Sequence, residues 1–160
     1  YIRQAMPDMH FLDAPALDGE ASQMAVHLAA QVISQRQHHA GKPYALVTGG
    51  ETTVTLDMND PGKGGRSQEL ALAFASAMTV AGSNAPKQWV ILAGGTDGRD
   101  GPTDAAGGII AASQDFDHAA ARAALLSHNS YDYLKAHDQL LMVGATGTNL
   151  ADLVLIVAQD

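Results

Sequence analysis

The sequence contains no cysteine. Disulfides and thiolate chemistry are therefore excluded, whatever the fold. A chain without cysteine is compatible with a reducing compartment, and we expect this protein to work in the cytoplasm.

Basic residues are scarce. Lys and Arg number nine against 17 Asp and Glu, which gives a net charge of -8. A nucleic-acid surface needs a basic stripe that displaces counterions, so we expect no nucleic-acid partner. No apolar run approaches the roughly 20 residues that a helix needs to cross a bilayer, so we expect no membrane partner. Against this background, an Arg inside a glycine-rich loop is conspicuous.

The composition is that of a folded domain. Of the 160 residues, 46% are hydrophobic and 16% are charged, as in globular chains. Apolar runs alternate with stretches of helical periodicity, and this predicts an α/β fold, a layered α/β/α domain with a mixed sheet. The expected strands are 10–12, 44–47, 51–58, 89–93, 140–143 and 153–157, and the expected helices begin near 20, 66, 119 and 131.

Residues 44–58 are expected to form an antiparallel pair of strands. A buried run at 44–47 ends in a Gly-Gly turn, and residues 51–58 then alternate in the manner of a half-buried strand. Upstream, Asp18 is expected to cap the helix that begins near Glu20.

Four polar loops follow or begin elements that are expected to be buried. They are 49–53, 62–69, 94–104 and 144–149. Each loop alone is also compatible with an ordinary turn or helix cap. Strand-end loops of α/β sheets commonly converge on one crevice, so together they predict part of a site for an anionic substrate.

Two residues in these loops have the chemistry for catalysis. Arg66 lies where a glycine loop enters a helix, and its planar fork suits a phosphate or carboxylate. Asp97 directly follows a buried strand, where a carboxylate can orient a hydroxyl or hold a hard cation. For Asp104, a helix cap is an open alternative. The glycine spacings fit neither a Walker A loop nor a dinucleotide-binding fingerprint.

Four ordered blocks carry a resemblance to a known family. They are GGETTVT at 49–55, GGRSQELA at 64–71, GTDGRDGPTDAAG at 95–107 and GTN at 147–149. With these blocks, residues 19–157 resemble the C-terminal domain of the glycerate 2-kinase family, called the multi-organism fragment with rich leucine (MOFRL). One departure is Ser67, where the family usually places Asn.

The resemblance implies phosphorylation of glycerate by ATP with Mg²⁺, in a cleft between two α/β domains. It implies that Arg66 clamps the substrate or phosphate and that Asp97 is an acid–base or metal-linked carboxylate. The metal ligands stay unassigned. The implied substrate-binding residues are Gly50, Glu51, Thr52, Thr53, Glu69, Asp100, Asp104 and Asn149.

The resemblance also implies a division of the chain. Residues 1–42 would be the tail end of a preceding N-terminal domain or a connecting helix, and residues 43–160 the MOFRL-type domain. The preceding domain, with most of the nucleotide surface, would be a partner from the same protein, and a homo-oligomer is possible. Two alternatives stay open, namely a hydroxypyruvate reductase, a name that members of the family also carry, and a non-catalytic anion-binding or assembly module.

Overall fold

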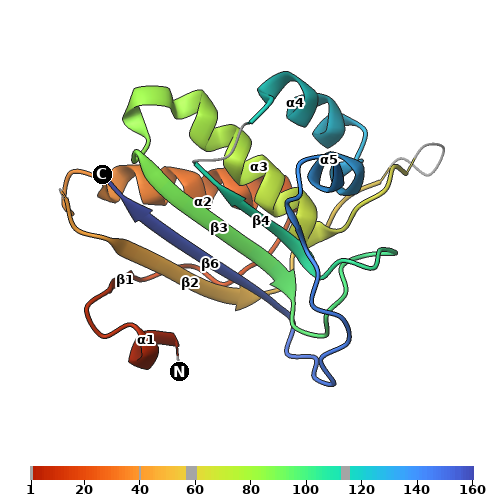
Figure 1. Cartoon of the computed structure of the whole chain (residues 1–160), viewed down its shortest axis with the longest axis horizontal. Coiled ribbons are helices and arrows are strands. Elements are labelled where there is room, and N and C mark those ends of the chain that lie inside the picture. Colours follow the sequence, from red (N-terminus) through yellow and green to blue (C-terminus); the bar gives the residue numbers. More distant parts are fainter. Residues whose placement is uncertain (1, 40, 57–60, 113–115) are drawn as a thin grey trace.

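The computed structural model describes residues 2–39, 41–56, 61–112 and 116–160. One six-stranded sheet has the order β1-β2-β6-β3-β4-β5 (Figure 1). β1 and β2 are parallel and the other four pairs are antiparallel, so the sheet is mixed. The strands are β1 His10–Leu12, β2 Tyr44–Gly50, β3 Gln88–Gly95, β4 Gly107–Ala111, β5 Leu140–Leu141 and β6 Asp152–Gln159.

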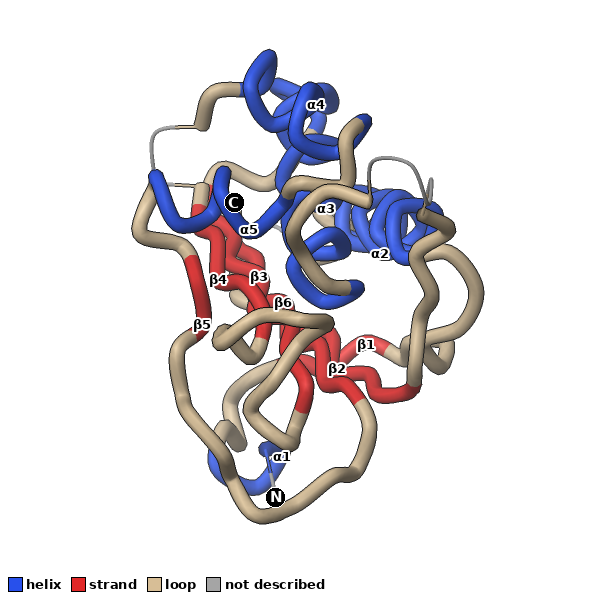
Figure 2. Tube along the Cα trace, turned by 90° about the vertical axis from the view of Figure 1, so that its right-hand side faces the viewer, coloured by secondary structure: helices blue, strands red, loops and turns tan. Residues whose placement is uncertain are grey.

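The longer helices lie on one face of this sheet. Figure 2 shows α2 to α5 on one side of the strands and the short α1 on the other. The predicted layered α/β class with a mixed sheet is confirmed, but the second helical layer of the expected α/β/α arrangement is represented, among the described residues, only by the four-residue α1. In the described ranges, no helix is long and apolar enough to traverse a bilayer. The helices are α1 Ile2–Ala5, α2 Ala21–Gln35, α3 Arg66–Ala81, α4 His118–Leu126 and α5 Ser130–Ala136, with a 3₁₀ turn, η1, at Gly82–Asn84.

The core lies between the sheet and the pair α2 and α3. Strand side chains alternate, and the helix-facing set, including Ile91 and Ile156, is fully buried together with Leu28 and Phe74. Burying side chains of this size contributes roughly 1.5–3 kcal/mol each. Because β1 and α2 belong to the same sheet and core as the rest, residues 10–35 are integral to the described fold. The domain division after residue 42 stays a prediction.

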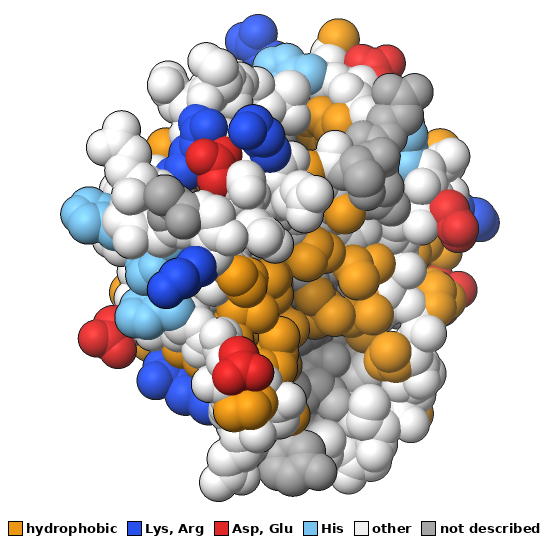
Figure 3. All heavy atoms as spheres, turned by 60° about the vertical axis from the view of Figure 1, so that its left-hand side comes forward, with side chains coloured by type: hydrophobic (Ala, Val, Ile, Leu, Met, Phe, Trp, Pro, Cys, Tyr) orange, Lys and Arg blue, Asp and Glu red, His pale blue; other side chains and the backbone are white. Residues whose placement is uncertain are grey.

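The opposite face of the sheet is apolar as well. Leu92 on β3 pairs with Leu155 on β6 and with Ile109 on β4, and all three are partly exposed. Figure 3 shows apolar side chains gathered at the centre of one face of the molecule. The two faces of the sheet therefore differ in how far they are covered rather than in polarity.

The antiparallel pair expected within residues 44–58 is wrong. β2 pairs with β6 over its whole length, whereas residues 51–56 form no strand and carry one isolated bridge, between Glu20 and Thr53. Residues 57 and 58 lie outside the described ranges. The alternating pattern has another cause, because the hydroxyls of Thr53 and Thr55 donate to the Glu20 carboxylate while Thr52 is buried.

The expected cap of α2 is also wrong. Asp18 accepts a hydrogen bond from the N–H of its neighbour Gly19 at 2.8 Å and caps no helix. Glu20 occupies the N-cap position, but its carboxylate is turned to the two threonine hydroxyls. These hydrogen bonds join the start of α2 to residues 53–55, which follow β2, and lower the pKa of Glu20.

Candidate functional site

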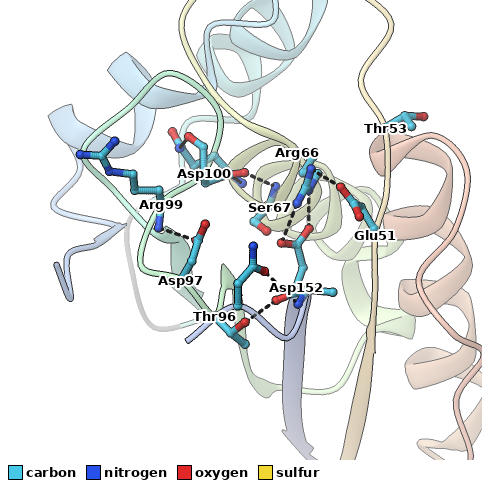
Figure 4. Close-up of polar contacts among 12 residues, drawn as sticks. Glu51, Thr53, Arg66, Ser67, Thr96, Asp97, Arg99, Asp100 and Asp152 are labelled. Atoms are coloured by element: carbon cyan, nitrogen blue, oxygen red, sulfur yellow. Dashed lines mark hydrogen bonds and ion pairs between the residues drawn. The ribbon is translucent and has the colours of Figure 1, made fainter. Parts of the chain in front are cut away.

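Arg66 begins α3 and lies between two carboxylates (Figure 4). Its Nε and Nη2 are 2.6 and 3.2 Å from the two carboxylate oxygens of Asp152, the first residue of β6. Its Nη1 is 2.7 Å from Oε1 of Glu51. The hydrogen bond to Asp152 is the main cause that raises the pKa of Arg66. Protein carboxylates thus already fill the planar fork that we predicted as a substrate clamp.

The two carboxylates differ in burial. Asp152 has 4% of its side chain exposed, whereas Glu51 has 62% exposed. The pair with Asp152 is bidentate and largely shielded from water, which makes it rigid. The exposed contact with Glu51 is of the kind that contributes at most about 1 kcal/mol. Glu51 is therefore the partner that another anion can replace.

Sequence reasoning missed Asp152. β6 lies between β2 and β3, and Asp152 is opposite Gly50 on one side and Gly95 on the other. Because neither neighbour has a side chain, this row of the sheet leaves room for the carboxylate beside Arg66. The available signal was a lone acidic residue directly before an apolar strand, and only the pairing across the sheet shows what that residue meets.

The N-terminus of α3 also holds a protein carboxylate. Asp100 accepts hydrogen bonds from the N–H of Ser67 at 3.1 Å and of Gln68 at 2.8 Å. The N-cap residue, Gly65, has no side chain to do this, and a Cβ there would collide with the Asp100 carboxylate. Asp100 therefore occupies the positive helix end that we expected to receive a substrate anion. Burial raises the pKa of Asp100 to about 6.

A buried network fixes the Asp100 loop to α3. Nε2 of Gln68 donates to Oγ1 of Thr103 at 2.9 Å and to the carbonyl of Asp100 at 3.3 Å. Oγ1 of Thr103 in turn donates to that carbonyl at 2.8 Å. All three residues are buried, so this part of the site is formed before any ligand arrives.

Asp97 is held more loosely. It follows β3, is only partly buried, and its Oδ1 accepts one hydrogen bond, from the N–H of Arg99 at 3.0 Å. Its Oδ2 has no hydrogen-bond partner among the residues that the structure describes. Figure 4 shows Asp97 on one side of Arg66, with Glu51 and Thr53 on the other. A carboxylate in this position is available to a ligand.

Thr96 ties this loop to the one before β6. Its Oγ1 donates to the carbonyl of Ala151 at 2.7 Å and accepts from the N–H of Leu150 at 2.8 Å. Asn149 is exposed, and its Oδ1 accepts from the N–H of Ala151 at 3.3 Å. The predicted convergence of these two loops is therefore present, with Thr96 as a link that sequence reasoning did not single out.

Two other predicted residues have local structural partners. Asp104 accepts from the hydroxyl of Tyr131 at 2.6 Å, and this hydrogen bond lowers the pKa of Asp104. No helix begins at Asp104, since the next element is β4, so the alternative of a helix cap is wrong. Gly50 has a φ of 144°, and a Cβ there would collide with the backbone of Leu17. This close approach requires glycine.

A pocket of about 470 Å³ opens beside Arg66, and two of its lining residues, Glu51 and Thr53, lie on the other side of Arg66 from Asp97 in Figure 4. Of the predicted residues, five line it: Glu51, Thr52, Thr53, Arg66 and Glu69. The others do not: Gly50, Asp97, Asp100, Asp104 and Asn149. The pocket also includes His128, which sequence reasoning did not identify, together with apolar side chains and a glycine-rich wall. The polar edge of the sheet thus divides into an open loop region at Asp97 and this pocket, with Arg66 between them.

The described carboxylates offer little to a bound metal. In the described ranges no three His, Asp or Glu side chains are grouped to hold an ion. Both Asp100 and Asp152 are engaged, by α3 and by Arg66. Asp97, in contrast, keeps its Oδ2 without a described partner. One free carboxylate suits a Mg²⁺ ion that arrives with nucleotide phosphates, because Mg²⁺ is usually held by one or two carboxylates plus phosphates and water.

Comparison with known proteins gives one family. The MOFRL family matches residues 44–152. A glycerate 2-kinase from Pyrococcus horikoshii is 36% identical over 156 residues, covering 92% of this chain and 33% of the relative. A D-glycerate 2-kinase from Thermotoga maritima is 37% identical, covering 88% and 33%. A putative hydroxypyruvate reductase from Agrobacterium vitis is also 37% identical, covering 89% and 33%.

Solved structures agree with the sequence comparison. A crystal structure of glycerate kinase from Thermotoga maritima superposes with a TM-score of 0.81 at 34% identity, covering 96% of this chain and 37% of that one. A Pyrococcus horikoshii crystal structure gives the same TM-score at 33% identity, covering 99% and 36%. The chain spans about a third of the length of the relatives it matches.

Proposed function

Because the chain belongs to the MOFRL family, we propose that it forms the C-terminal part of a glycerate 2-kinase, which transfers a phosphoryl group from ATP to glycerate. Glycerate is the substrate named for the relatives from Pyrococcus horikoshii and Thermotoga maritima. The proposed residue roles follow from the geometry around Arg66.

The contact between Arg66 and Glu51 is the observation that carries the proposal. An exposed carboxylate lies 2.7 Å from Nη1 of a guanidinium that Asp152 holds in place from the other side. The carboxylate of glycerate has the same chemistry as the Glu51 side chain. We propose that it replaces Glu51 on Arg66, with little loss because an exposed ion pair contributes little.

Asp97 supplies the second role. Its free oxygen lies in a partly exposed loop near Arg66, which supports a role in orienting the attacking hydroxyl of glycerate or in meeting the metal. Phosphoryl transfer depends mostly on positioning and on neutralising charge. Asp100 and Asp152 would then be positioning residues, since they fix α3 and Arg66. Asn149, Asp104 and Gly50 would hold the surrounding loops.

ATP and Mg²⁺ belong to the same proposal. Mg²⁺ would be held mainly by the nucleotide phosphates, with Asp97 as a candidate carboxylate ligand, and would neutralise charge during transfer. The relatives are about three times as long as this chain. We propose that an N-terminal domain of the same protein supplies the remaining groups and closes over this edge of the sheet. A cytoplasmic location and a homo-oligomer stay predictions.

The reductase name carried by the Agrobacterium vitis relative points to a second activity. Hydride transfer needs a bound dinucleotide, and this sequence carries no glycine fingerprint for one. The decisive test uses the full-length parent enzyme in two parallel assays. We expect glycerate-dependent release of ADP from ATP and no hydroxypyruvate-dependent oxidation of NADH or NADPH. Reduction of hydroxypyruvate without release of ADP would overturn the kinase proposal, and saturable glycerate binding with neither reaction would favour the non-catalytic module.

A further inference from the structure

The pocket beside Arg66 is larger and more apolar than glycerate alone requires. Its volume of about 470 Å³ falls within the range of roughly 300–1,000 Å³ typical of sites for drug-sized ligands, whereas glycerate is a three-carbon acid. Its sides include four apolar residues: Val54, Leu56, Pro61 and Pro102. A small, strongly hydrated anion gains nothing from such walls, but a flat heterocycle does.

The same pocket contains a polar pair made of a buried carboxyl group and a partly exposed imidazole. Glu69 on α3 has 5% of its side chain exposed, and its Oε2 lies 2.9 Å from Nδ1 of His128. No described residue hydrogen-bonds its other carboxylate oxygen or Nε2 of His128. Burial raises the pKa of Glu69. Neither that carboxylate oxygen nor Nε2 of His128 belongs to the fully buried, unpaired atoms of the described residues, so both are open to the pocket, where a ligand with matching donors and acceptors can bind them.

The pair is rigidly placed. His128 follows α4 with a φ of 50°, a conformation that non-glycine residues adopt only under constraint. The loop that forms one wall is hydrogen-bonded to the same segment. The N–H of Lys63 donates to Oδ1 of Asn129 at 3.3 Å, and the N–H of Tyr131 donates to the carbonyl of Lys63 at 3.0 Å. The wall and the polar pair therefore form one preorganised unit.

The pocket also has the right position for a phosphoryl donor. Arg66 lines it, and Asp97 lies on the other side of Arg66 (Figure 4). A nucleotide whose base enters the pocket would direct its phosphates toward Arg66, where the proposed acceptor carboxylate takes the place of Glu51. Apolar walls around a carboxyl–imidazole pair match the two faces and the polar edge of a purine.

We propose that this pocket binds the purine base of the phosphoryl donor, with Glu69 and His128 hydrogen-bonding its edge and Leu56 packing on its face. The inference rests on the proposed kinase function, but it assigns the nucleoside site to this chain rather than to the preceding domain. Glu69 and His128 then set the specificity for the base, while Arg66 contacts phosphate.

The test is steady-state kinetics of the full-length parent enzyme, with ATP and glycerate varied separately. Leu56→Lys should raise the KM for ATP at least tenfold and leave the KM for glycerate within twofold. Leu56 is 42% exposed, so the substitution should not prevent folding. The matched control is Leu126→Lys, at a leucine 77% exposed on α4 and outside the pocket, which should change neither constant.

The polar pair is tested by Glu69→Gln and by His128→Asn, since Asn tolerates a positive φ. Both substitutions should raise the KM for ATP more than the KM for the corresponding 6-oxo purine nucleotide, because the 6-oxo base presents a different set of hydrogen-bonding groups at its edge. If the pair has only a structural role, the KM values for both nucleotides should change equally. That result would overturn the assignment of base specificity to Glu69 and His128. An unchanged KM for ATP in Leu56→Lys, with kinase activity intact, would overturn the pocket proposal and leave the kinase proposal standing. An increase in the KM for glycerate alone would assign the pocket to the acceptor and would equally overturn it.

Discussion

Two groups of acidic residues lie along the same edge of the sheet, and they are held in different ways. Around the start of α3, Asp100 and Asp152 are buried and fully engaged by backbone N–H groups and by Arg66. In the loop after β3, Asp97 is partly exposed and accepts one described hydrogen bond. Asp100 and Asp152 therefore fix the positions of α3 and Arg66, whereas Asp97 is available to contact a ligand. The difference teaches that carboxylates from one sequence block, residues 95–107, can have separate tasks.

The largest effect is expected at Asp97. Asp97→Asn should reduce turnover of the parent enzyme by about 100-fold or more, which is the usual scale for losing a positioned acid–base group. Its stability should change by less than about 0.5 kcal/mol, because the side chain is not part of the core. Activity and thermal unfolding should be measured on one sample. A large drop in Tm with normal turnover per folded molecule would move Asp97 into the structural group.

Asp152 should differ from Asp97, because its substitution should lower both stability and turnover. Asp152→Ala leaves Arg66 without its buried partner, and we expect the free energy of unfolding to fall by about 2 kcal/mol. Turnover should fall by about 100-fold, because a shift of about 1 Å in a positioning group has that effect. Asp132→Ala, at an exposed carboxylate on α5, serves as the control. Normal stability of the Asp152 variant would show that the ion pair does not hold the start of α3.

Arg66→Lys tests the geometry of the guanidinium. The guanidinium of Arg66 can bind Asp152 with two nitrogens and a substrate carboxylate with the third. A lysine keeps the charge but has only one nitrogen and cannot make these contacts together. We expect the KM for glycerate to rise, or turnover to fall, by at least tenfold. Kinetic constants within twofold of the wild type would contradict the role of Arg66 as a clamp.

Asp100 should affect stability rather than turnover, and its effect should appear as a dependence of stability on pH. Its folded pKa of about 6 lies above the ordinary value of 3.8, so the folded state binds the proton more tightly than the unfolded state does. The stabilisation from that proton is present at low pH and is lost as the pH rises through 6. Relative to Asp100→Asn, the wild type should therefore lose about 1–3 kcal/mol between pH 4 and pH 8. Denaturant unfolding of both proteins at several pH values checks this prediction. A gain in the stability of the wild type relative to Asp100→Asn with rising pH would contradict it.

Periodicity predicted most of the fold because it is a local property. The helical spacing of Leu70 and Phe74 and the apolar runs of β3 and β6 are visible in any short window of sequence. The strand expected at residues 51–58 failed because an alternating pattern also arises when hydroxyls bind one carboxylate, here that of Glu20. Periodicity does not distinguish these two causes.

Only those features of the candidate site that lie within a single loop could be predicted from the sequence. Arg66 and Asp97 stand out by residue type and position, and whether they act as proposed stays a prediction. The partners of Arg66 depend on the strand order β2-β6-β3, which brings together residues 51, 66 and 152. The polar pair in the pocket joins residues 69 and 128 in the same manner. Contacts across such sequence distances have no local signal.

The central claim is that this chain holds one part of a kinase site and needs the rest of the parent protein to act. The direct measurement is ADP release by the purified 160-residue chain with glycerate, ATP and Mg²⁺, with its folded state checked by circular dichroism. We expect a folded chain with no turnover above background, because in-line positioning of donor and acceptor requires the groups of the second domain. Glycerate-dependent release of ADP that Arg66→Ala abolishes would contradict the account and would mean that this chain contains the whole site.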